Sequence, residues 1–297
     1  MRKVVLLVIA TVLLSACNQQ CKQTNECNTK EIMSVENNQT LPQAQDGDVF
    51  AGINLTVAES KRLIAKGIVN YAPVKEKLKK GMVIVTSGTT NTYIAEELVG
   101  LDAPRGSFMT GNITPQSRGN VAEGLTRVPN ITLVDGKPID IDYEEALKQF
   151  QEGDIIFKGA NLLNYAKKQA AVCIGAPDGG TTSRVRAYTT EGKGKLIVPI
   201  GLEKETSGDL NEYEKLLENK VEQLSYVPRV WMHQNAEIFT EIEAIKTFAP
   251  VNVAPYAAGG IAGREGGISL FVYGTKENVQ KVLDVIATIQ GEEPFVK

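Results

Sequence analysis

Short apolar runs alternate with segments of helical spacing through most of the chain. The runs MVIVTS, DIIFKGA, AAVCIGA and KLIVPIG, starting at residues 82, 154, 170 and 195, are typical of buried strands. Helices are predicted from Thr56 through Ile68, after Pro73, through Tyr93, over 143–151 and over 209–222. This alternation predicts an α/β domain over residues 52–227 with a largely parallel sheet and right-handed crossovers.

Two local signals sharpen this prediction. Thr56 and Glu59 have the spacing of a helix capping box. Asp135-Gly136 lies between two apolar segments and predicts a tight hairpin turn.

The pattern changes after Pro228. RVWMHQNAEIF, VNVAPYAAGG and GISLFVYG have strand character, and TEIEAIKTFA and KENVQKVLDVIATIQG have helical character. With a final short extended segment this order is βαββαβ, which predicts a ferredoxin-like domain over residues 228–297. The Gly-rich segment 259–267 is then a turn between two strands that presents Arg264 to a cleft.

The first residues indicate where the protein is located. Residues 1–16 contain two cations, an apolar run too short for an ordinary membrane span, and small residues, as in a secretory signal. LSAC at residues 14–17 resembles the lipobox of bacterial lipoproteins, which implies lipid attachment at Cys17. We therefore expect a palmitoylated, membrane-anchored protein of the cell envelope on the extracytoplasmic side.

Residues 17–51 are rich in polar side chains and predict a flexible tether. Cys21 and Cys27 in this segment are compatible with a disulfide or with no function. Cys173 lies in an apolar run and is interpreted as a small buried hydrophobe.

The composition argues against several classes of function. With 42% hydrophobic residues and a net charge of −3, the chain is typical of a globular protein and lacks the basic excess of a nucleic-acid binder. It contains one histidine, His233, and four cysteines, so neither a metal site nor a cofactor is predicted. His233 is interpreted as structural or surface-exposed.

Polar residues follow three of the predicted strands. Because the carboxyl ends of parallel strands share one sheet edge, where open α/β sheets bind ligands, these residues predict a cleft for a small anionic ligand. The alternative is that both loops are ordinary turns with Ser/Thr caps. The candidate ligand-binding residues are Ser87, Gly88, Thr89, Thr90, Lys158, Asn161, Asp178, Gly179, Gly180, Thr181 and Thr182.

Three segments between residues 74 and 290 resemble ribose-5-phosphate isomerase A. LKKGMVIVTSGTTNTYIAEELVG resembles its first phosphate loop, although Thr86 replaces the first glycine of that loop. GDIIFKGANLL resembles its strand ending in Asp-Gly-Ala-Asp, and APDGGTTSRVRAY followed by KLIVPIG resembles its Gly-rich loop, helix and next strand. The resemblance implies the ribose-5-phosphate isomerase and CoA-transferase type of fold with a ferredoxin-like lid.

The catalytic residues of that family do not carry over. Lys158 and Asn161 stand at the two Asp positions, Pro177 or Asp178 at the Lys position, and Val185 or Arg186 at the Glu position. An aldose–ketose isomerase needs a base to move a proton, so we do not expect isomerase activity.

Three hypotheses stay open. The first is a protein that binds a small anion at the cell surface. The second is an enzyme of another chemistry that uses Lys158, Asp178 or Glu265, and the third is a surface interaction module. The partners expected are the lipid bilayer and a small anionic ligand, without nucleic acid.

Overall fold

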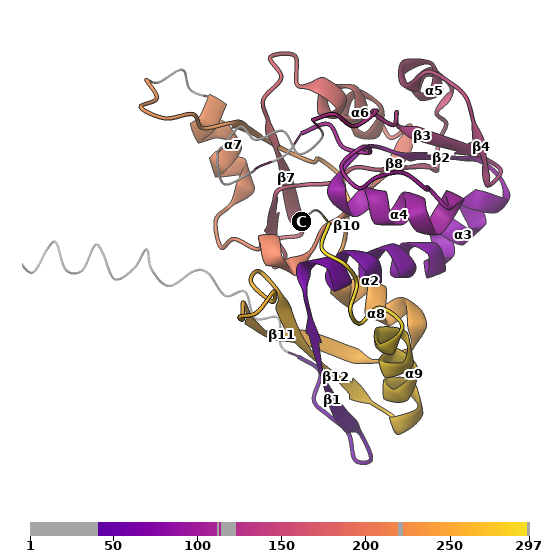
Figure 1. Cartoon of the computed structure of the whole chain (residues 1–297), viewed down its shortest axis with the longest axis vertical. Helices are drawn as coiled ribbons and strands as arrows, with labels where there is room; N and C mark the ends of the chain where they lie inside the picture. The colour runs from indigo at the N-terminus through magenta and orange to yellow at the C-terminus, as the bar shows by residue number, and fades with distance from the viewer. Residues whose placement is uncertain (1–40, 112, 114–122, 219–221, 296–297) are drawn as a thin grey trace, which may run out of the picture. The chain divides into compact units, whose positions relative to one another are not determined.

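A six-stranded mixed sheet forms the centre of the α/β fold (Figure 1). The computed structural model describes residues 41–111, 113, 123–218 and 222–295. The sheet order is β10 (Glu237–Phe239), β8 (Gly194–Pro199), β5 (Asp154–Phe157), β2 (Met82–Val85), β3 (Ile131–Val134) and β4 (Lys137–Ile139). The first four strands are parallel, and β3 and β4 are antiparallel to their neighbours.

The central strands confirm the prediction that the apolar runs at residues 82 and 154 form buried strands. Every residue of β2 and β5 is buried, as expected when helices cover both faces of a parallel sheet. The hairpin between β3 and β4 turns at Asp135 and Gly136, both with positive φ, as the sequence predicted.

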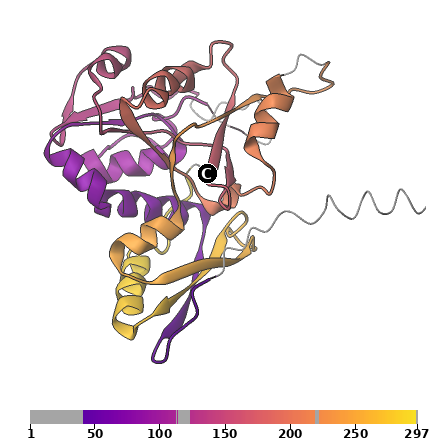
Figure 2. The same ribbon diagram turned by 180° about the vertical axis from the view of Figure 1, so that it is seen from behind.

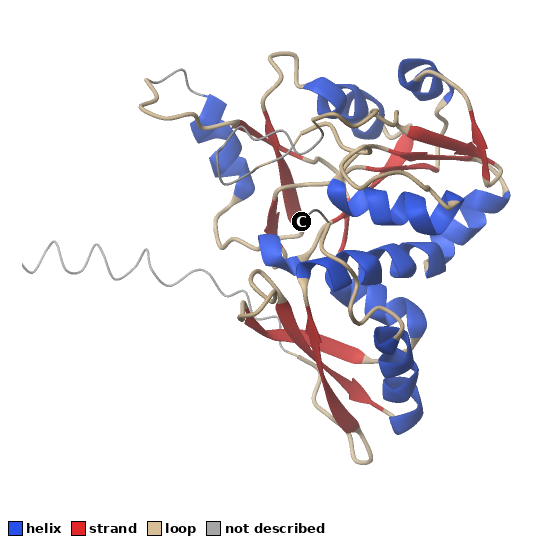
Figure 3. Cartoon of the chain, in the orientation of Figure 1, coloured by secondary structure: helices blue, strands red, loops and turns tan. Residues whose placement is uncertain are grey.

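Eight helices surround the three sheets in the described part of the chain (Figure 3). They are α2 (Val57–Asn70), α3 (Ala72–Lys79), α4 (Thr89–Val99), α5 (Tyr143–Gln149), α6 (Gly180–Thr190), α7 (Leu210–Glu218), α8 (Glu241–Phe248) and α9 (Lys276–Ala287). α3 and α4 lie on one face of the central sheet, and α5 and α6 lie on the other (Figures 1 and 2). The predicted capping box is present, because the Glu59 N–H donates to Thr56 Oγ1 and the Thr56 N–H donates to Glu59 Oε2.

Two antiparallel three-stranded sheets complete the fold. One has the order β1 (Val49–Leu55), β12 (Ile268–Gly274) and β11 (Asn252–Ala258). The other has the order β6 (Leu162–Asn164), β7 (Gln169–Ile174) and β9 (Arg229–Met232). The run AAVCIGA therefore lies in an antiparallel sheet and not in the parallel one.

The prediction of a separate ferredoxin-like unit after residue 228 is wrong. The strands expected to form it belong to three sheets, since β9 pairs with β7, β10 pairs with β8, and β11 pairs with β12, which in turn pairs with β1. RVWMHQNAEIF does not form one strand, because residues 233–236 interrupt it and Asn235 has a φ of 53°. The expected boundary between 227 and 228 thus does not separate one sheet from another.

The three-stranded sheet with β1 shares its core with the central sheet. Ile53 and Leu55 of β1 belong to the same buried cluster as Val83 and Ile155. Helices α2 and α8 approach closely at Gly67, where a Cβ would lie 2.5 Å from the Ala244 Cα. Residues 41–297 accordingly form one compact unit.

Strand β1 corrects the predicted end of the tether, because residues 49–51 pair with β12. Cys17, Cys21 and Cys27 lie outside the described residues. Of the helices that the structure describes, none has the length and apolar character needed to cross a membrane.

Candidate functional site

The carboxyl ends of β2 and β5 lie side by side at one edge of the central sheet. Val85 pairs with Phe157, so Thr86 and Lys158 follow the two strands at adjacent positions. The Thr86 backbone N–H (3.2 Å) and its hydroxyl (2.8 Å) both donate to the Phe157 carbonyl. The Asn91 amide, in the first turn of α4, donates to the same carbonyl at 3.2 Å. These bonds connect the start of α4 to the residue that precedes Lys158.

The loop before α4 uses part of its hydrogen-bonding capacity internally. The Ser87 N–H donates to Asn130 Oδ1 at 2.8 Å, and the Gly88 N–H donates to the Phe108 carbonyl at 3.0 Å. Contrary to the prediction, these two N–H groups therefore do not face a ligand. Helix α4 has no side-chain cap, and the N–H groups of Thr89 and Thr90 have no acceptor among the described residues. The positive end of α4 is open at these two positions.

Lys158 is the unusual group at this edge, because its side chain is only 8% exposed. Within the part of the chain that the structure describes, its ammonium has neither a hydrogen-bond acceptor nor a carboxylate partner. Desolvation by burial lowers the pKa of Lys158 from 10.5 to about 8. A buried cation without a counter-ion is costly for a protein, so this position favours an anion supplied from outside.

His233 lies beside Lys158, which the sequence did not indicate. Its backbone N–H donates to the Ala170 carbonyl at 2.9 Å, and its Nε2 lies 3.2 Å from the carbonyl oxygen of Gly159. Burial lowers the pKa of His233 to about 3, and the charge of Lys158 adds to this effect. His233 is therefore neutral and provides no negative charge to balance the lysine.

The turn at 179–182 reaches the same region through β9. Gly179 has a φ of +81°, and a Cβ there would lie 2.4 Å from the Trp231 ring. Trp231 and His233 are two residues apart, so they are expected on one face of the strand. The start of α6 and the backbone after Lys158 thus both pack on side chains of this segment.

The polar residues of this turn have mostly local roles. Asp178 is exposed, accepts the Gly180 N–H at 2.9 Å and forms an ion pair with Arg184 at 3.7 Å. Asp178 thus bonds the N–H of the first residue of α6 and has a local role in the turn. Thr182 is buried and Thr181 is half-buried.

Asn161 and Arg264 do not have the roles that the sequence predicted. Asn161 Oδ1 accepts the Cys173 N–H at 2.9 Å and so extends the pairing of β6 with β7. Arg264 donates to the Gly259 carbonyl, to Asn54 and to Ser269, so it stabilises the turn between β11 and β12.

A second group of ionisable side chains follows β8 and β10 at the same edge of the sheet. Glu241 is fully buried and accepts the Leu202 N–H at 3.0 Å, while Glu203 Oε2 is buried and has no hydrogen-bond partner among the described residues. Burial, with the neighbouring Glu203, raises the pKa of Glu241 to about 8. Lys204 joins this group to the Lys158 segment by donating to the Ala160 carbonyl at 2.9 Å.

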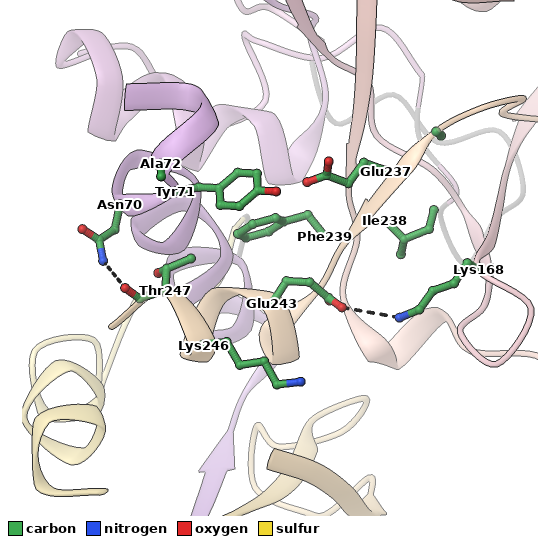
Figure 4. A pocket seen from close by; sticks show the side chains of 11 residues that line it. Asn70, Tyr71, Ala72, Lys168, Glu237, Ile238, Phe239, Glu243, Lys246 and Thr247 are labelled. Carbon is green, nitrogen blue, oxygen red and sulfur yellow. Dashed lines mark hydrogen bonds and ion pairs between the residues drawn. The ribbon is translucent and has the colours of Figure 1, made fainter. Parts of the chain in front are cut away.

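A separate pocket of about 620 Å³ borders the edge strand β10 (Figure 4). The Tyr71 and Phe239 rings form an aromatic wall with centroids 5.3 Å apart, and the Tyr71 hydroxyl points toward Glu237. Glu243 accepts from Lys168 at 3.4 Å across the opening. Most polar groups of this pocket thus already have partners, unlike Lys158.

Two observations complete the picture of the site. Among the described residues, no group of three or more His, Cys, Asp or Glu side chains is arranged to hold a metal ion. No family model, no curated protein and no solved structure matches the chain, so the resemblance to ribose-5-phosphate isomerase A stays a prediction.

Proposed function

We propose that this protein binds a small anionic molecule at the carboxyl ends of β2 and β5. The observation that carries this proposal is the buried residue Lys158, whose ammonium has no counter-ion among the described residues. The open first turn of α4 adds N–H groups and a positive dipole end nearby. A phosphate or carboxylate group bound there would replace the missing negative charge.

Two of the three candidate residues of the enzyme hypothesis form local hydrogen bonds in exposed turns. Asp178 accepts the N–H of Gly180 at the start of α6, and Glu265 accepts the Gly263 N–H in an exposed turn. Of the three, only Lys158 is both buried and without a partner within the described residues. Binding therefore has the stronger support.

Replacement of Lys158 by methionine tests this function. Lys158→Met should weaken binding of an anionic ligand by about 1.5–3 kcal/mol, the contribution of a charge-assisted hydrogen bond. The measurement is a thermal-shift screen of the full chain in detergent against phosphorylated, carboxylated and CoA-type compounds, followed by titration calorimetry of each hit.

The control is Lys148→Met, which removes an exposed lysine whose partner Glu145 is also exposed. It should leave the affinity unchanged. Equal ligand affinity of Lys158→Met and the unaltered chain would refute the proposal. Unfolding of Lys158→Met without ligand would instead show an architectural role, because removal of an unpaired buried cation should not reduce stability.

We also propose that the chain is a lipoprotein anchored through Cys17, on the basis of the signal-like residues 1–16 and the LSAC motif. Cys17→Ser should abolish metabolic labelling with a radioactive fatty acid, because serine has no thiol to accept the lipid. Fatty-acid labelling that persists in Cys17→Ser would exclude this anchor. The control variant Cys21→Ser should still be labelled.

A further inference from the structure

We propose that the Lys158 amine forms a reversible imine with an aldehyde or ketone that also carries a carboxylate or phosphate group. This inference rests on the proposed anion site and adds a substrate class and a covalent step to it. Its starting point is the Lys158 side chain, which is more than nine-tenths buried at the end of a central strand and unpaired within the described residues.

Within the described residues, the absence of a carboxylate neighbour distinguishes the buried Lys158 from the half-buried Lys61. Lys61 also has a pKa lowered to about 8, but Glu203 lies near it and opposes that shift. A nearby carboxylate stabilises the protonated form of a lysine, which has no lone pair to donate. Lys158 has no such partner in the described structure, so its amine is free to react once it has lost its proton.

Burial increases the fraction of free amine. The pKa of Lys158 falls from 10.5 to about 8, so a much larger share of this group than of a surface lysine is neutral near pH 7.5. The neighbouring groups do not reverse this shift. His233 is neutral, and Arg186, which also acts on the His233 pKa, is a cation.

His233 holds the backbone that carries the amine. A carbonyl oxygen only accepts hydrogen bonds, so the contact with Gly159 assigns the proton to Nε2 and leaves Nδ1 as an acceptor. His233 is therefore a positioning residue for the segment directly after Lys158.

The chemical step balances without any redox partner. The neutral Nζ attacks the carbonyl carbon, so that a C–N bond forms and the C–O π bond breaks. One of the two Nζ protons moves to the carbonyl oxygen to give a carbinolamine. The hydroxyl group and the second Nζ proton then leave together as one water molecule, which breaks the C–O bond and gives the C=N bond. Addition of water reverses the sequence.

The positive end of α4 favours a substrate that carries an anionic group. Thr89 and Thr90 lie at the positive end of α4, and their N–H groups have no acceptors in the described structure, which favours an anionic substituent on the carbonyl compound. Glyoxylate, an α-oxo acid, is a very small molecule that has both a reactive carbonyl group and a carboxylate.

Reductive trapping tests the imine. The full chain in detergent is incubated with glyoxylate and sodium cyanoborohydride, and the modified lysines are identified by peptide mass mapping. We expect Lys158 to be modified about tenfold faster than the exposed Lys148 at pH 7.5. The rate of Lys158 modification should level off above about pH 8.

Two comparisons define the specificity. Acetaldehyde, which has no anionic group, should modify Lys158 more slowly than glyoxylate does, and equal rates would refute the proposed substrate class. Inorganic phosphate should slow the reaction of Lys158 with glyoxylate but not that of Lys148. A preference for Lys148 or Lys61 over Lys158 would refute the imine.

Lys158→Arg separates this inference from the proposed function. Arginine keeps the charge but cannot form the imine, so this variant should keep the thermal shift given by inorganic phosphate and lose the adduct at residue 158. If the unaltered chain binds phosphate but gives no adduct at Lys158, anion binding stands and the imine is wrong. If phosphate does not bind and no adduct forms, both proposals are wrong.

Discussion

Glu241 shows how one buried residue sets the response of this fold to pH. Its carboxyl group has no exposed surface, lies at the start of α8 and accepts the Leu202 N–H. Burial first, and then the nearby Glu203, raises its pKa from 4.5 to about 8. The folded chain therefore holds a proton on Glu241 that the unfolded chain releases.

The sign of this effect predicts a pH dependence of stability. Because the folded-state pKa lies above the unfolded value, the stabilising contribution of Glu241 is complete below pH 4.5 and is lost as the pH rises toward 8. Glu241→Gln, which is neutral at every pH, should remove this dependence. The difference should amount to a few kcal/mol at most, since one pKa unit corresponds to about 1.36 kcal/mol.

Urea unfolding of both proteins between pH 5 and pH 8.5 measures this difference. The stability of the unaltered chain should fall relative to Glu241→Gln across this range. A constant difference between the two curves would show that Glu241 does not titrate differently in the folded state.

At the scale of elements, two arginines connect α2, α4 and the C-terminal segment. Arg62 on α2 forms ion pairs with Glu96 and Glu97 on α4 and with Glu292. Arg105 pairs with Glu96 and Glu292 as well, and both guanidinium groups lie over the Tyr93 ring at 4.8 and 4.3 Å. A network of this kind fixes how the elements pack on each other.

Loss of Arg62 should therefore destabilise the fold. Arg62 has a side-chain exposure of 12%, and Arg62→Met leaves three partly buried carboxylates without this partner. We expect a loss of about 1–3 kcal/mol in the free energy of unfolding, below the range for fully buried pairs. Lys79→Met, which breaks an exposed pair with Glu76, should cost less than about 0.5 kcal/mol. Equal losses in the two variants would contradict this structural role.

At the scale of the whole molecule, segments far apart in the chain share every sheet. β1 begins at residue 49 and pairs with β12, which ends at residue 274. β10 completes the parallel sheet that β2 began more than 150 residues earlier. Because of this connectivity, we expect residues 41–297 to fold as one cooperative unit and not as two independent domains.

The sequence alone determined the local structure, because local structure depends on neighbouring residues. The apolar runs of β2, β5 and β8, the capping box at Thr56 and the turn at Asp135 were all read correctly. Each of these signals acts over a few residues through burial pattern, cap chemistry or φ preference.

Only the tertiary structure decided strand partners and the surroundings of the candidate site. Nothing in the local pattern of β1 or β9 specifies the partner strand, since pairing depends on segments that chain connectivity leaves far apart. The same is true of Lys158, whose position after β5 was predictable from the sequence, whereas its burial beside a neutral His233 was not. Burial and the lack of a counter-ion within the described residues are properties of the three-dimensional environment of Lys158, and they make its amine a candidate for binding and reaction.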